Sequence, residues 1–285
     1  MKLLLTGSSG FIGSYFQSNY GDKYDISTFS FQNDNFHKLD LNQVNTIIHL
    51  SALVHQMGGA DENEYKRINV DNTIALAQKA KQNGVKQFIF MSSVKVYGEE
   101  SNIPYTETTR CEPQDDYGRS KLKAEKYLLS MQDDNFTVSI LRTPIVYGAG
   151  VKANIQNLIK LVRKVPILPF GGIDNRRSMV YIGNLCQLIH KLCKTKISGV
   201  FLAGDDRPVT TTEFIELIAK ELGRTVHFVK IPFFEPLLKS FKPSFHKRLY
   251  ESLEINNSVT KEILNFRNPY SLEQGIKYML NGEKK

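Results

Sequence analysis

The sequence has 285 residues, of which 41% are hydrophobic and 23% charged, and its formal net charge is +8. This length is enough for an α/β unit with a smaller second lobe, and the composition excludes disordered and fibrous classes of protein. The positive charge leaves four interpretations open: nucleic acid, an anionic membrane surface, doubly charged phosphate ligands, or a basic surface that contacts only solvent.

The chain begins with a short apolar run, Met1 to Thr6, that ends at glycines and predicts a strand rather than a signal peptide. No apolar stretch approaches the ~20 residues that a membrane-spanning helix needs, so we expect a soluble protein. Cys186 and Cys193 are separated by about 10 Å along a predicted helix, too far to form a disulfide. These features predict a reducing, cytoplasmic location, and no cysteine has a spacing typical of a metal site.

Apolar runs alternate with amphipathic stretches through the first half of the chain, a pattern typical of βαβ units and a parallel sheet. The predicted strands are Lys2 to Thr6, Tyr24 to Ser30, Thr46 to Leu50, Gln87 to Met91 and Thr137 to Arg142. Two helices are predicted, Glu62 to Asn83, which ends at a glycine, and Asp116 to Met131. We therefore predict a Rossmann-type, doubly wound α/β sheet with a smaller C-terminal substrate-binding lobe.

Beyond Arg142 the alternation fades, and glycines and prolines separate shorter elements. The chain is expected to return to the sheet around Val200 to Ala203, and helices are predicted near Thr212 to Leu222 and Ser258 to Leu264. Residues 1–148 are predicted to form the Rossmann domain, with 178–205 returning to it. Residues 149–177 and 206–285 are predicted to form the substrate-binding lobe.

Basic residues are interleaved with phenylalanines between Arg224 and Arg248. Such a stretch has the composition of a nucleic-acid or interfacial patch. Because prolines interrupt any long helix there, we predict a loop-rich lobe that packs its aromatic side chains.

The segment Thr6-Gly7-Ser8-Ser9-Gly10-Phe11-Ile12-Gly13 lies between the first strand and an amphipathic stretch, where a glycine pattern indicates a dinucleotide site. Gly7 permits a tight turn, Gly10 lets the backbone approach a pyrophosphate, and Gly13 lets the helix pack close to the strand. The helix N-terminus then favours the anion. The alternative is that the glycines only form a turn that requires positive φ, without binding a cofactor. The cofactor contacts predicted from this loop are Gly7, Ser9, Gly10, Phe11, Ile12 and Gly13.

The second strand ends in Phe29-Ser30-Phe31, without the acid that normally binds the adenosine ribose of NAD. No arginine replaces that acid to hold a 2′-phosphate, although Ser30, His37 and Lys38 are available. NAD(H) and NADP(H) remain alternatives.

Tyr117 and Lys121 are four residues apart and therefore share one face of the second predicted helix. A phenol is a poor acid–base catalyst at neutral pH, and a nearby ammonium is expected to lower its pKa. Ser93 follows a buried strand at its carboxyl end, where parallel sheets bind ligands, and can hydrogen-bond the same substrate oxygen. On their own, these patterns are also those of a solvated helix face and a polar strand end.

Together these residues resemble the extended short-chain dehydrogenase/reductase family, in its nucleotide-sugar epimerase and dehydratase group, over nearly the whole chain. The resemblance implies that Ser93, Tyr117 and Lys121 are catalytic, that Lys121 also holds the nicotinamide ribose, and that Asp40 contacts the adenine. Asn69-Val70 resembles a helix motif of the family. Further cofactor contacts implied by the resemblance are Ser30, Leu41, Leu50, Ser51, Ala52 and Pro144.

On the substrate side, the segment at Arg177 resembles the stretch whose arginine grips the substrate diphosphate. Ile145 stands near a position where the family's UDP-galactose epimerases carry an asparagine. Segments that begin at Ser92, Val151 and Asn175 are instead similar to a bacterial polysaccharide-pathway subgroup that reduces UDP-4-keto-6-deoxy-N-acetylhexosamines at the 4-keto group. The substrate contacts that follow are Ser93, Val94, Asn154, Arg177 and His55.

The resemblance therefore implies an NAD(P)H-dependent 4-keto reductase acting on a UDP-sugar, in a homodimer paired through the two predicted helices. A UDP-sugar 4-epimerase with tightly bound NAD is the alternative. A dehydratase is disfavoured because Val94 and Lys95 replace an acidic pair, and a non-catalytic cofactor-binding protein is disfavoured because all three catalytic residues are present. No nucleic-acid motif is present, and two bound diphosphates are a sufficient account of the positive charge.

Overall fold

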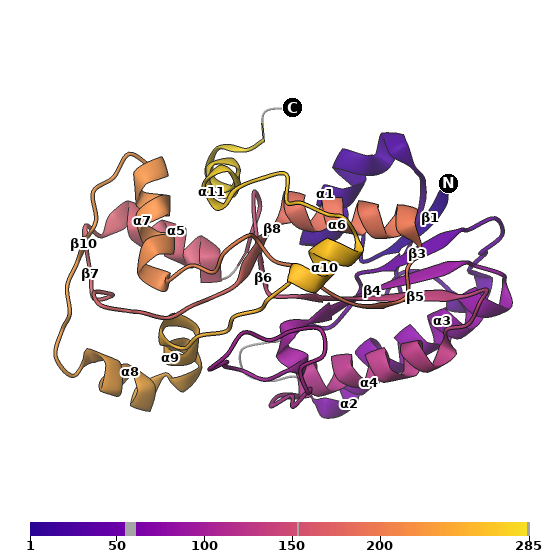
Figure 1. Cartoon of the computed structure of the whole chain (residues 1–285), viewed down its shortest axis with the longest axis horizontal. Helices are drawn as coiled ribbons and strands as arrows, with labels where there is room; N and C mark the ends of the chain where they lie inside the picture. The colour runs from indigo at the N-terminus through magenta and orange to yellow at the C-terminus, as the bar shows by residue number, and fades with distance from the viewer. Residues whose placement is uncertain (55–60, 153, 284–285) are drawn as a thin grey trace.

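The computed structural model describes residues 1–54, 61–152 and 154–283, and its centre is a sheet of six parallel strands (Figure 1). In spatial order the strands are β2 (Asp25–Phe29), β1 (Lys2–Thr6), β3 (Thr46–His49), β4 (Gln87–Ser93), β5 (Thr137–Thr143) and β9 (Gly199–Leu202). The order reverses between β1 and β3, the place where open α/β sheets bind ligands. The predicted α/β fold is confirmed, and each predicted strand ends within two residues of the observed one.

Both faces of the sheet are covered by helices because its strands are apolar on both sides. Leu3 and Leu5 of β1 pack with helices α1 (Phe11–Tyr20) and α6 (Ile182–Thr195). Leu4, between them, points to the opposite face, which α3 (Asn72–Gln82) and α4 (Asp116–Met131) cover (Figure 1). This is the doubly wound arrangement that the near-continuous apolar runs predicted.

The predicted helix Glu62 to Asn83 is present but contains a wider turn. It consists of α2 (Glu62–Tyr65), a π-helical turn at Lys66–Asp71 and α3. Asn69 lies in that turn, and its side chain bonds the amide and carbonyl of Leu53 at 2.8 and 2.9 Å. The turn therefore fixes the backbone that follows β3. Such bulges are frequent at functional sites.

The remaining elements lie beyond the carboxyl ends of the strands. They are two short parallel pairs and six helices: β6 (Ile145–Tyr147) with β8 (Met179–Tyr181), β7 (Ile167–Leu168) with β10 (His227–Phe228), α5 (Asn154–Lys164), α7 (Thr211–Glu221), α8 (Phe234–Phe241), α9 (Pro243–Tyr250), α10 (Ser258–Ile263) and α11 (Leu272–Asn281). The division of the chain into two domains at the predicted bounds stays a prediction.

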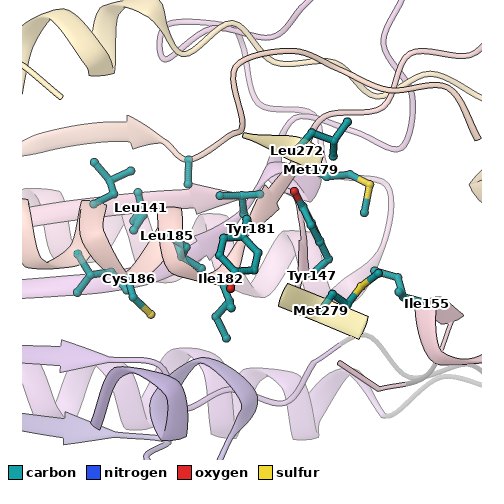
Figure 2. Close-up of a cluster of buried hydrophobic side chains, with 14 of the residues drawn as sticks. Leu141, Tyr147, Ile155, Met179, Tyr181, Ile182, Leu185, Cys186, Leu272 and Met279 are labelled. Carbon is teal, nitrogen blue, oxygen red and sulfur yellow. The ribbon is translucent and has the colours of Figure 1, made fainter. Parts of the chain in front are cut away.

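One buried cluster joins these elements to the sheet (Figure 2). The rings of Tyr147 and Tyr181, from β6 and β8, lie 5.6 Å apart, between Leu185 of α6 and Met279 of α11. The Tyr147 hydroxyl donates to Asp205 at 2.7 Å. The C-terminal helices are therefore held by a continuous core and not by a flexible linker.

The prediction for the basic, phenylalanine-rich stretch is wrong. Most of it forms the helices α8 and α9, and three of its five phenylalanines are exposed, with Phe233 84% and Phe241 77% exposed. Phe228 and Phe234 pack against the core. Among the described residues, no helix has the length and apolar character needed to cross a membrane.

Candidate functional site

The glycine turn after β1 has the backbone shape that the sequence predicts. Gly7 has a φ of 70°, and a Cβ on it would lie 2.8 Å from the Ser51 amide nitrogen. A Cβ on Gly13 would lie 2.3 Å from the Gly7 carbonyl oxygen. Gly10 precedes α1 without a capping side chain, so the first amide groups of the helix are left for a ligand.

This turn forms one wall of a cavity of about 550 Å³ at the point where the strand order reverses. The other walls are the segments that follow β2 and β3 and one side of the helix that contains Arg67. The predicted cofactor residues that line this cavity are Gly7, Ser9, Gly10, Phe11, Ile12, Gly13, Ser30, Leu50, Ser51 and Ala52.

Five predicted cofactor residues are not among those that line the cavity: Asp40, Leu41, Pro144, Tyr117 and Lys121. Asp40 is exposed, and its carboxylate accepts from the Asn42 amide at 2.8 Å. Leu41 is buried in the core beneath the sheet. Pro144 is buried between β5 and β6. The structure therefore gives no cavity contact for these residues, and their role stays a prediction.

Sequence analysis missed Arg67 and Glu64, which line the same cavity. Their side chains lie 4.0 Å apart. Glu64 lies in α2, just before the π-helical turn that contains Asn69, and Arg67 lies in that turn, so the Asn69 motif was the available signal. Arg67 bears on the choice between NAD and NADP, because an arginine can hold the 2′-phosphate that only NADP carries.

Ser93, Tyr117 and Lys121 come together where β4 ends and α4 begins. Asp115 caps α4 by accepting from the Gly118 amide at 2.7 Å. A Cβ on Gly118 would lie 2.6 Å from the Lys95 carbonyl oxygen, so the first turn of α4 packs directly on the turn that follows Ser93. The Ser93 hydroxyl hydrogen-bonds the Tyr117 phenol.

The expected effect of Lys121 on Tyr117 is not found. Burial raises the pKa of Tyr117 to about 12. The Ser93 hydrogen bond acts in the opposite direction and lowers this pKa, but its effect is smaller. The Lys121 ammonium instead donates to the Met91 carbonyl at 2.8 Å and lies 4.5 Å from the centre of the Phe90 ring. Burial lowers the pKa of Lys121 to about 7, although the negative charge of Glu125 acts in the opposite direction. The sequence did not reveal this backbone acceptor.

A buried ion pair lies next to these residues. Arg142 of β5 donates to Glu125 of α4 with its shortest contact at 2.6 Å, and both side chains are almost fully buried. Ser92 also bonds Glu125, and the Arg142 guanidinium lies 4.7 Å from the centre of the Tyr97 ring. Glu125 therefore ties α4 to the ends of β4 and β5, next to Ser93.

A second cavity, of about 300 Å³, lies among the C-terminal elements. Asn154 and Arg177, two of the predicted substrate contacts, line it, as do Ile145 and Arg248. Sequence analysis missed Arg248, which lies at the end of the basic stretch. Val94 is buried and lines neither cavity, and Ser93 lines neither as well. His55 lies outside the described residues.

Arg177 is buried without full satisfaction of its donors. Its Nη1 donates to the Glu251 carbonyl at 2.8 Å, but its Nε has no hydrogen-bond partner among the described residues. Burial and the neighbouring Arg248 lower its pKa to about 10. Two guanidinium groups at one cavity, one of them with an unsatisfied donor, suit an anionic ligand.

The profile of a family described as "NAD dependent epimerase/dehydratase family" matches residues 3–204. The chain belongs to this family. It is 34% identical to a UDP-glucose 4-epimerase of Vibrio cholerae, over 97% of this chain and 93% of that protein. A dTDP-4-dehydro-6-deoxyglucose reductase of Escherichia coli is 28% identical over 64% of this chain and 60% of that protein.

The fold is shared with solved structures of the same type. The UDP-glucuronic acid 4-epimerase of Bacillus cereus, solved in complex with NAD, superposes with a TM-score of 0.78 at 22% identity, over 99% of this chain and 98% of that chain. The resemblance seen in the sequence is confirmed. The protein is an enzyme of the nucleotide-sugar epimerase and reductase class within the extended short-chain dehydrogenases.

The cavity at the glycine turn fits the dinucleotide of this family. Gly7 and Gly13 leave no room for a side chain, and the uncapped start of α1 supplies amide donors for a pyrophosphate. Gly10 donates to the Gly7 carbonyl at 3.0 Å, which holds the turn in this shape. These residues are suited to hold NAD or NADP.

Proposed function

We propose that this enzyme reduces the 4-keto group of a UDP-4-keto-6-deoxy-N-acetylhexosamine in the biosynthesis of a bacterial surface polysaccharide. The observation that carries the proposal is the Tyr117 phenol. It is held protonated by burial, hydrogen-bonded to Ser93, and located at the carboxyl edge of the sheet that also bears the dinucleotide cavity. A carbonyl that accepts a hydride also needs a proton, and this phenol is built to donate one.

The proton balance of the reduction assigns a role to each residue. Reduced nicotinamide, when bound, supplies the hydride that forms the new C–H bond at C4. Tyr117 donates its phenolic proton to the carbonyl oxygen, and the Ser93 hydroxyl orients that oxygen. The phenolate that remains is stabilised by the same serine hydrogen bond, which already lowers the pKa of Tyr117 in the free protein.

The substrate diphosphate is assigned to the second cavity. Arg177 and Arg248 supply two guanidinium groups there, and Asn154 supplies an amide. Both arginines carry charge that matches a diphosphate, and the unsatisfied Nε of Arg177 needs an acceptor. Within this proposal, residues 1–148 and 178–205 bind the cofactor and residues 149–177 and 206–285 bind the sugar nucleotide.

A UDP-sugar 4-epimerase is the second candidate, because the Vibrio cholerae relative has that name. An epimerase begins by removing a proton from a sugar hydroxyl, which requires a phenolate. Tyr117, raised in pKa by burial, is protonated in the free protein, and both candidates use this same residue. Ile145, which lines the substrate cavity, also stands near a position where UDP-galactose epimerases carry an asparagine.

The two candidates are separated by product analysis. The purified protein is incubated with NADH or NADPH and a UDP-4-keto-6-deoxy-N-acetylhexosamine, and separately with UDP-N-acetylglucosamine and no added coenzyme, and the products are assigned by NMR. Coenzyme oxidation equal to the alcohol formed supports the reductase. Formation of the 4-epimer without coenzyme overturns it in favour of the epimerase, and no reaction with either substrate refutes both.

Tyr117→Phe tests the proton donor directly. We expect it to lower kcat by about 10² to 10⁴-fold while the coenzyme still binds. Tyr127→Phe is the matched control, because Tyr127 lies on the same helix but is exposed, and its hydroxyl accepts from Gln78 at 2.7 Å. Equal activity of the Tyr117 variant and the control would contradict the mechanism.

A further inference from the structure

The solvent-facing side of α8 is apolar, although it belongs to none of the core clusters. We call the surface formed by Phe233, Leu237, Phe241 and Phe245 the α8 face. Their exposed fractions are 84%, 57%, 77% and 45%. Helix α8 lies at the end of the molecule opposite the six-stranded sheet (Figure 1). The α8 face is thus an apolar surface with no partner inside the described chain.

The outward direction of these side chains is fixed by the helix. Phe233, Leu237 and Phe241 are four residues apart and share one side of α8, whereas Phe234 and Leu238 pack inward against the core. Phe233 has a φ of 62°, a left-handed conformation that is unfavourable for a bulky residue. The exposure of Phe233 is therefore maintained against a backbone preference, and strain of this kind concentrates at functional surfaces.

The segment that carries the α8 face is strongly basic. The segment from Val229 to Arg248 contains a single acid, Glu235, whose carboxylate contacts His246 of α9 at 3.3 Å. The basic residues of the same segment are Lys230, Lys239, Lys242, Lys247 and Arg248. Exposed apolar side chains in a strongly basic segment are complementary to a surface with an apolar interior and anionic headgroups, which is the structure of an anionic lipid bilayer.

The α8 face is also continuous with the second cavity. Phe245 belongs to the α8 face and at the same time lines that cavity, as do Arg248 and Leu249 of the same helix. A molecule that covers the whole α8 face therefore contacts a residue that also lines the second cavity. This position distinguishes the α8 face from exposed apolar residues elsewhere, such as Ile103 and Ile263.

We propose that the α8 face binds peripherally to anionic lipid bilayers, with Phe233, Leu237 and Phe241 inserted at the interface and lysines of the same segment on the phospholipid headgroups. This contact places the second cavity at the membrane surface. The proposal does not depend on which reaction the enzyme catalyses.

Co-sedimentation with vesicles tests the contact. The full chain is mixed with vesicles of phosphatidylcholine containing about 30% phosphatidylglycerol, and with pure phosphatidylcholine vesicles, at low salt and at about 0.5 M NaCl. We expect binding to the anionic vesicles that falls with salt, and weaker binding to the neutral ones. The triple variant Phe233→Ser, Leu237→Ser, Phe241→Ser is expected to lower partitioning by about tenfold or more.

The matched control is the triple variant Ile103→Ser, Val259→Ser, Ile263→Ser, which removes exposed apolar side chains outside the α8 face. Circular dichroism and coenzyme binding verify that both variants are folded. Equal sedimentation of the two variants would overturn the proposal. So would a wild-type protein that stays in solution with anionic vesicles, or that instead self-associates through these residues in light scattering, since the occupant would then be a second copy of the chain.

Discussion

Lys121 buries a positive charge, and we expect its removal to stabilise the protein. The side chain is 2% exposed, and its ammonium has one neutral acceptor, the Met91 carbonyl. Burial lowers its pKa from an ordinary 10.5 to about 7. A shift of this size corresponds to a free-energy penalty on the order of 5 kcal/mol for the charged form in the folded state. Lys121→Met keeps the length of the side chain without the charge.

The stabilisation expected from Lys121→Met depends on pH, because proton binding by Lys121 is linked to folding. Below about pH 7 the ammonium is charged in both folded and unfolded states, so the folded protein carries the whole penalty. Between about pH 7 and 10.5 the unfolded chain holds a proton that the folded protein does not, so the stability of the wild type rises with pH. Above that window the penalty is gone. The advantage of Lys121→Met is therefore largest at low pH and declines through the window.

Urea unfolding at about pH 6, 8 and 10.5 measures this difference, with Lys123→Met as the control, because Lys123 is exposed on the same helix. Loss of the hydrogen bond to Met91 subtracts about 1 kcal/mol at every pH and leaves the slope unchanged. At pH 6 the net gain corresponds to roughly 10 °C in Tm. Unfolding free energies that run parallel for Lys121→Met and wild type across the window would refute the reasoning.

Three further predictions rest on other contacts. Gly13→Ala places a Cβ 2.3 Å from a backbone oxygen of the glycine turn and should abolish coenzyme binding in calorimetry, whereas Gly21→Ala, which meets no atom within 4 Å, should not. Glu125→Gln leaves the Arg142 guanidinium buried without its counter-charge and should destabilise the protein by about 3–5 kcal/mol in urea. The double variant Glu125→Gln, Arg142→Met should recover part of that loss. Arg67→Ala should weaken NADPH more than NADH in fluorescence titration if this arginine holds the 2′-phosphate, and equal effects would assign it another role.

The sequence predicted the sheet well because each strand is an apolar run bounded by glycine or polar residues, and this signal is local. Helix α4 was predicted at its observed bounds for the same reason. The glycine turn was predictable because only glycine fits Gly7 and Gly13, where a Cβ would meet a backbone nitrogen and a backbone oxygen. Each of these features depends on residues that are close together in the sequence.

The features that were not predicted depend on contacts between distant segments. The acceptor for Lys121 is a backbone carbonyl 30 residues away, which no side-chain pattern encodes. The exposure of Phe233 and Phe241 depends on which side of α8 meets the core, and composition alone favoured burial. Arg248 reaches the second cavity only because α9 packs beside the segment that contains Arg177.

The two halves of the proposed chemistry therefore have different structural support. Ser93 and Tyr117 are positioned by the contacts between the turn after β4 and the first turn of α4, which include the Lys95–Asp115 ion pair at 2.6 Å. In the proposal, the anionic side of the substrate meets Asn154 of α5, Arg177 just before β8 and Arg248 of α9, which are distant in sequence and line one cavity. Substitutions in the C-terminal elements can alter which sugar nucleotide binds without moving the proton donor. A family built this way is expected to keep its hydride chemistry while its substrates diverge.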